Sequence, residues 1–175
     1  MRLALCGVVA ALSTAVLFLT GILPVATVAA PALAGLFLIA VVAETDVKHG
    51  FGTYLVVCVL AALVAPDREA ALLFVLFFGY YPVLYGLLSR LKNAVIRYLL
   101  KFLLFNAAMV LDAVLAIFLL GIPAEEFFEQ GRFFAVFLLL AANAVFAVYD
   151  FCMNGLIVFY IRRLHPFVGK YLKQK

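Results

Sequence analysis

The chain has 175 residues, of which 69% are hydrophobic and only 13% are charged, and its mean hydropathy is +1.25. Soluble globular domains are about half apolar and about one-quarter charged, so this chain has too few polar side chains to coat a water-facing surface. We therefore expect an integral membrane protein without a soluble catalytic or nucleic-acid-binding domain, and the net charge of +4 does not indicate nucleic acid as a partner.

Six apolar runs follow one another along the chain. A bilayer's hydrocarbon core is ~30 Å thick and needs about 20 helical residues, and turn formers or charged residues separate the runs. The pattern predicts an all-α, polytopic membrane protein with a single domain. The expected spans are residues 3–23, 25–43, 51–65, 70–88, 94–122 and 133–161, followed by a basic tail over residues 162–175. The third run is short for a span and could also form a re-entrant segment.

The basic residues indicate how these spans are oriented. With six spans and a cytoplasmic N-terminus, eleven of the 13 Lys and Arg residues lie inside or at the inner boundary, and only Arg68 and Arg132 lie outside. If the third run did not cross, the basic segment 90–101 and the basic tail would both face outward, which the positive-inside rule disfavours. We therefore expect both termini in the cytoplasm. The first run also resembles a secretory signal, with small residues for cleavage at 25–30, but we favour a retained span.

Small residues line one face of the first run. Gly7, Ala11 and Ala15 follow one another at intervals of four residues. In lipid, such a stripe lets a second helix approach closely, and van der Waals contact then drives association. The stripe could serve a partner protein or the packing of the chain's own bundle.

Two charged residues inside the fifth and sixth runs are expected to pair. Lys101 and Asp150 lie at about the same depth on antiparallel helices, since each residue advances a helix by ~1.5 Å. A buried charge needs a partner, so we interpret Lys101 and Asp150, helped by Asn154, as a structural ion pair.

A second set of polar residues lies near or outside the middle of the membrane without a basic residue at the same level. Buried polar groups are costly unless they are hydrated or bound, which favours a ligand pocket that opens outward. We expect Asp112 and Asn143 to hold a small ligand, with Asn106 and Tyr80 or Tyr81 as the wall. Pro82 follows the tyrosines and predicts a kink.

Several enzyme classes lack support. Residues 125–130 resemble the E-E-x-x-x-R motif of intramembrane CAAX-type proteases, but Gln130 replaces the arginine and neither histidine lies within a span. The sequence has no D-x-x-D-G, G-x-S-x-G or H-E-x-x-H motif and no phosphate-binding glycine loop. The cysteines lie in apolar runs without C-x-x-C spacing. We expect no enzymatic activity, cofactor or metal site.

The first run reads LALCGVVAALS over residues 3–13, and an apolar turn with Pro24 follows it. With six helices in a chain of this length, the protein resembles the S components of energy-coupling-factor (ECF) transporters. In that family, an alanine-rich stripe of the first helix docks on a transmembrane T subunit, and Gly7, Ala11 and Ala15 occupy the matching positions. The resemblance implies a subunit of the bacterial plasma membrane that captures a vitamin-like molecule or metal ion from outside and docks on a T subunit with two ATPases.

Two rival interpretations use the same helical design. One is a non-transporting scaffold that resembles the MreD-like cell-shape proteins and binds other membrane proteins. The other is a self-sufficient small transporter or channel. The cavity distinguishes capture from scaffolding, because an S component needs an outward pocket lined by the polar residues and tyrosines, whereas a scaffold should fill that space with Leu and Phe.

Overall fold

The computed structural model describes residues 2–23, 26–121 and 132–164. Every regular element within these ranges is helical, which confirms the predicted fold class over the described part of the chain. Pro24, the acidic segment at 125–130 and the tail beyond residue 164 lie outside the described residues.

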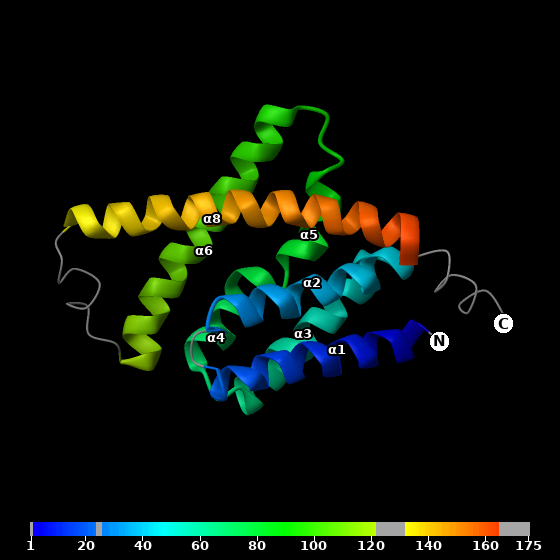
Figure 1. Cartoon of the computed structure of the whole chain (residues 1–175), viewed down its shortest axis with the longest axis horizontal. Helices are drawn as coiled ribbons and strands as arrows, with labels where there is room; N and C mark the ends of the chain where they lie inside the picture. The colour runs from blue at the N-terminus through cyan, green and yellow to red at the C-terminus, as the bar shows by residue number, and fades with distance from the viewer. Residues whose placement is uncertain (1, 24–25, 122–131, 165–175) are drawn as a thin grey trace.

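The first three helices form one packed unit (Figure 1). Helix α1 is Arg2–Phe18, continued by the short η1, Leu19–Gly21; α2 is Ala29–Glu44 and α3 is Val47–Val64. One face of α1 is buried, and on it Ser13 Oγ donates to Ala34 O of α2 at 2.9 Å. Apolar side chains from all three helices fill the space between them, with Leu17, Leu38 and Val57 fully buried.

The fourth span is interrupted in its middle. It consists of α4 (Arg68–Leu73), a π-helical segment η3 (Phe74–Phe78) and α5 (Tyr81–Leu88). The amide of Gly79 donates to Phe74 O at 2.8 Å, five residues back, which closes the wide turn. Pro82 lies in the first turn of α5, where its missing N–H leaves no helical hydrogen bond unmade. The proline thus begins a helix rather than bending a continuous one.

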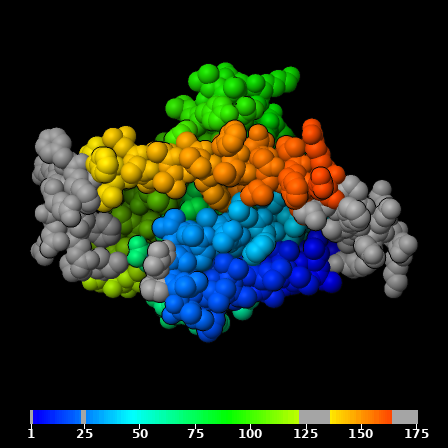
Figure 2. Space-filling model, viewed as in Figure 1, coloured from blue at the N-terminus to red at the C-terminus, as the bar shows by residue number. Residues whose placement is uncertain are grey.

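The last two helices are long and cross each other. Helix α6 is Ala94–Leu120, and α8 is Arg132–Phe159, continued by the π-helical η4 (Tyr160–Leu164). Asn93 caps the start of α6, and Gly121 ends it in the left-handed conformation at φ 69°. Helix α8 passes in front of α6 in Figure 1, and the beginning of α6 projects beyond α8 in Figure 2.

Five helical segments among the described residues are long and apolar enough to cross a membrane, which makes this a multi-pass membrane protein. They are Arg2–Gly21, Val47–Val64, Arg68–Leu88, Ala94–Leu120 and Val136–Arg163. The third run, expected to be short, is lengthened because Asp46 caps a helix that begins at Val47. The short segment is instead α2, which has 16 residues and begins at Ala29 rather than near residue 25.

Candidate functional site

A buried ion pair joins α6 to α8. Lys101 is 3% exposed, and its Nζ lies 2.7 and 2.9 Å from Asp150 Oδ1 and Oδ2. The lysine also lies over the ring of Tyr85, 4.0 Å from its centre, which adds a cation–π contact. The pair expected from equal depth is therefore present. Asn154, expected to help it, is exposed on α8 and does not contribute a hydrogen bond to the pair.

Tyr81 hydrogen-bonds to this ion pair and lines neither of the two larger cavities described below. It is fully buried, and its hydroxyl donates to Asp150 Oδ1. A third helix, α5, is thereby tied to the same carboxylate that holds α6. A tyrosine in the middle of a span needs a partner for its hydroxyl, and this requirement could have pointed to a nearby acidic or amide side chain without specifying Asp150.

Asn106 of α6 and Asn143 of α8 bind each other. Each side-chain amide donates to the other's oxygen, at 2.8 and 3.0 Å, and each also donates to a backbone carbonyl four residues earlier, that of Phe102 or Leu139. The partners that we expected a ligand to supply are thus supplied within the chain. These two amides act as an interhelical brace, which is a common use of asparagine in lipid.

The other two residues expected in the ligand pocket are placed separately. Asp112 is half-buried on α6, and its Oδ1 has no hydrogen-bond partner within the described part of the protein. Tyr80 packs edge-on against the rings of Tyr54 and Phe77. Asp112 and Tyr80 therefore make no hydrogen bond to Asn106, Asn143 or Tyr81 in the described structure.

Aromatic rings fill much of the space between η3, α6 and α8. Phe105 of α6 stacks on Phe146 of α8, with ring centres 4.6 Å apart and planes 7° from parallel. Phe77 of η3 meets both of these rings edge-on, at 5.2 and 5.6 Å. This aromatic packing resembles the filled interior that we expected of a scaffold.

A cavity of about 510 Å³ nevertheless remains beside these rings. We call it the apolar cavity, because no charged side chain lines it and none of the five predicted pocket residues does. Its lining residues are Val28, Ala29, Ala32, Leu73, Phe77, Phe78, Phe105, Met109, Ala142, Val145, Phe146 and Tyr149. The sequence did not reveal it, because these residues are indistinguishable from ordinary helix-packing residues when read along the chain.

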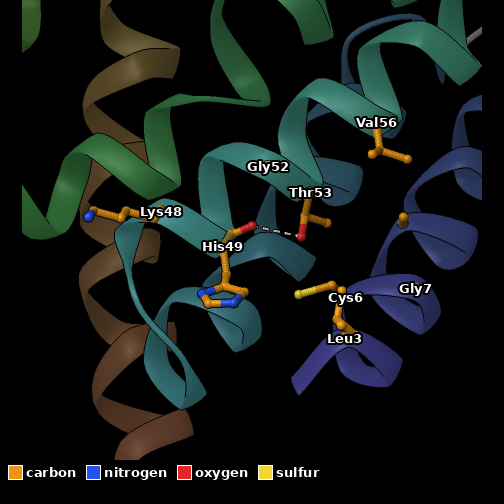
Figure 3. A pocket seen from close by; sticks show the side chains of 9 residues that line it. Leu3, Cys6, Gly7, Lys48, His49, Gly52, Thr53 and Val56 are labelled. Atoms are coloured by element: carbon orange, nitrogen blue, oxygen red, sulfur yellow. Dashed lines mark hydrogen bonds between the residues drawn. The ribbon is translucent and has the colours of Figure 1, made fainter. Parts of the chain in front are cut away.

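A second cavity of about 500 Å³ lies between α1 and α3 (Figure 3). Leu3, Cys6 and Gly7 of α1 face the beginning of α3 across it, and the thiol of Cys6 points toward the ring of His49. The side chain of Lys48 points away from this space (Figure 3). The walls are therefore almost entirely apolar, and Gly7 has open space where a Cβ would lie.

The small-residue stripe of α1 is exposed along its length, although Gly7 at its beginning borders the cavity between α1 and α3. Gly7, Ala11 and Ala15 are all exposed, whereas Ala10 and Leu17, on an adjacent face of α1, are buried against the neighbouring helices. Of the two interpretations left open by the sequence, the exposure of Ala11 and Ala15 favours a face for a partner over packing within the bundle.

At the beginning of α3, Asp46 is held in its ionised form. Its carboxylate accepts hydrogen bonds from the backbone N–H and from Nδ1 of His49, each at 3.0 Å. The backbone hydrogen bond is the main reason that the pKa of this carboxyl lies below its usual value.

Within the described part of the chain, no group of three or more His, Cys, Asp or Glu residues is placed to hold a metal.

Comparison of the chain with protein-family models, curated proteins and solved structures found no match. Over the residues that the structure describes, the fold is helical and its long apolar helices are those expected of a multi-pass membrane protein.

Proposed function

We propose that this chain is the substrate-capture subunit of an ECF-type importer in a bacterial plasma membrane. It would bind a small molecule from outside and dock through α1 on a T subunit that carries two ATPases. The observation that carries this proposal is the exposure of Gly7, Ala11 and Ala15 on a helix whose other face is packed. Small side chains gain nothing in particular from contact with lipid, but they allow a partner helix to approach closely.

The proposed topology has six crossings with both termini in the cytoplasm. The beginning of α1, the turn between α2 and α3, and the end of α8 lie at one end of the molecule (Figure 1). Helix α2 packs against both α1 and α3, and we take it as the sixth crossing although its 16 residues span only about 24 Å. Arg2, Lys48, Arg162 and Arg163 then share the cytoplasmic side, as the positive-inside rule favours.

The apolar cavity supports the capture part of the proposal. Its volume of about 510 Å³ is within the ~300–1,000 Å³ that is usual for small-molecule sites. Val28 and Ala29 line it at the start of α2, which is the outer end of that helix in the proposed topology.

The docking part is tested by replacing Ala11 with Leu. A bulky side chain in the middle of the stripe holds the partner helix away, so co-purification with a T subunit and its ATPases in mild detergent should be lost. Ala144→Leu, at an exposed position of α8, is the matched control and should leave co-purification unchanged. The docking proposal fails if both variants retain the partner equally, or if Ala11→Leu prevents folding.

A non-transporting, MreD-like scaffold is the second candidate. The observations that favour it are the aromatic packing between η3, α6 and α8 and the mutual pairing of Asn106 with Asn143. A scaffold would co-purify with envelope proteins rather than with ATPases, and its stability would not respond to small molecules.

A further inference from the structure

We propose that the apolar cavity binds an uncharged, mainly apolar molecule that carries an aromatic ring. This inference rests on the proposed capture function and assigns the chemical class of the captured molecule. It places the ligand among residues different from the polar set that the sequence had singled out.

The walls exclude a charged ligand. None of the residues that line the apolar cavity carries a charge, so an ionised group placed there would lose its hydration without gaining a partner. The buried ion pair nearby offers no free charge, because Asp150 already accepts from Lys101 through both oxygens and from Tyr81. A cation or a carboxylate would therefore enter this cavity only at a large cost.

The walls also favour a ring over an aliphatic chain. Five of the lining side chains are aromatic, namely Phe77, Phe78, Phe105, Phe146 and Tyr149. Phe105 and Phe146 are stacked, whereas Phe78 meets Tyr149 edge-on with centres 5.3 Å apart and planes 85° from parallel. The rings in the wall are thus held in fixed relative orientations, and an aromatic guest can pack against such a wall by stacked or edge-on contacts.

Small residues keep the cavity open. Ala29 and Ala32 of α2 and Ala142 of α8 lie in its wall, where longer aliphatic side chains would fill the space. Phe146 lies four residues after Ala142 on α8, and its stacking on Phe105 does not depend on the side chain at position 142. A single larger side chain at position 142 should therefore fill the cavity without removing any of the five rings.

The test measures the thermal unfolding midpoint of the purified full-length chain in mild detergent with three probes. Indole is an uncharged ring, indole-3-acetate is its charged counterpart, and decanol represents a lipid-like chain. A molecule that binds only the folded state raises the midpoint in a saturable way. We expect a saturable rise with indole that is at least several times larger than the rise with either of the other probes.

Two pairs of variants locate the binding. Ala142→Phe should abolish the shift produced by indole, whereas Ala141→Phe, at an exposed position on the same turn of α8, should leave it intact. Ala32→Leu fills the cavity from α2 and serves if Ala142→Phe does not fold. An indole shift that survives both cavity-filling variants overturns the assignment of the site.

The remaining outcomes separate this inference from the proposed function. A larger shift with indole-3-acetate, or with decanol alone, overturns the ligand class but leaves capture possible. No shift with any probe overturns the inference, while co-purification with a T subunit would still support docking. An indole shift that depends on position 142, in a chain that never co-purifies with ATPases, keeps the ligand class and removes the importer proposal.

Discussion

At the scale of single residues, the strongest interactions in the described structure converge on Asp150. One carboxylate receives the buried ammonium of Lys101 and the hydroxyl of Tyr81, so three helices meet at one charge. The bond lengths to Lys101 are typical of charge-assisted hydrogen bonds. Because the ion pair is buried, removing one charge leaves the other without compensation. This destabilises the protein more than removing both charges does.

A double-mutant cycle checks this coupling. Lys101→Ala or Asp150→Ala alone should destabilise the protein by about 3–5 kcal/mol, because the remaining charge is buried without compensation. The double variant should lose clearly less than the sum of the two, as measured by unfolding in detergent. Lys92→Ala, at an exposed position, is the control and should change little. Additive losses would show that the two charges do not depend on each other.

The cap at the beginning of α3 gives a pH-dependent prediction. The folded-state pKa of Asp46 lies below its usual 3.8, so its stabilising effect is complete above that value and is lost as the pH falls through the lowered pKa. The melting temperature should therefore decline below a pH of about 4. In Asp46→Asn, the side-chain oxygen can still cap the helix but does not titrate, and this part of the decline should be missing. An identical decline in both proteins would assign it to other carboxyl groups.

Residue-level prediction from the sequence succeeded where depth and charge specified a unique partner. Lys101 and Asp150 are the case in point, since one basic and one acidic group lie at the same level. It failed to foresee that Asn106 and Asn143 bind each other. A buried amide must find a partner, but the sequence does not say whether that partner is a ligand or another side chain.

At the scale of helices, α2 and η3 approach each other closely at Gly35. A Cβ placed on Gly35 would lie 2.1 Å from the backbone oxygen of Phe78, so glycine is what allows these two segments to touch. A backbone atom cannot turn aside as a side chain can, and the helices must therefore move apart to admit any larger residue.

Gly35→Ala should consequently destabilise the protein by about 3 kcal/mol or more, since the added methyl group forces the backbones apart. Gly86→Ala is the matched control, because no atom lies within 4 Å of its Cβ position and alanine is the better helix former. The control should be neutral or slightly stabilising. Equal melting temperatures for the two variants would contradict the close approach.

The sequence predicted the existence of the helices better than their interruptions. Runs of apolar residues located every long helix, but the π-helical turn at Phe74–Phe78 is as apolar as the helical residues around it and so could not be distinguished from them. Pro82 suggested a kink within a helix, whereas the break precedes it at Gly79 and Tyr80. The beginning of α3 was missed because Asp46 and Lys48 were read as a loop, although an aspartate before an apolar run is a typical helix cap.

At the scale of the whole molecule, the six-crossing topology can be checked by labelling single cysteines. In a variant that lacks Cys6, Cys58 and Cys152, a membrane-impermeant thiol reagent added outside intact cells should label Arg68→Cys. Lys48→Cys and Arg90→Cys should react only after the membrane is opened, because the positive-inside rule places them in the cytoplasm. If Lys48→Cys and Arg68→Cys react alike from outside, both ends of α3 lie on the same side and the third crossing does not exist.

The ion pair between α6 and α8 has a consequence for the synthesis of the protein, because its two residues are made at different times. Asp150 comes 49 residues after Lys101 along the chain. At ~5–20 residues per second, a ribosome needs about 2–10 s to make that stretch. During this interval the acidic residue that pairs with the lysine in the structure has not yet been made, and the bilayer strongly disfavours an unpaired charge. Insertion of α8 supplies Asp150 and ends this interval. A chain truncated before α8 would keep Lys101 as an unpaired charge inside the bilayer.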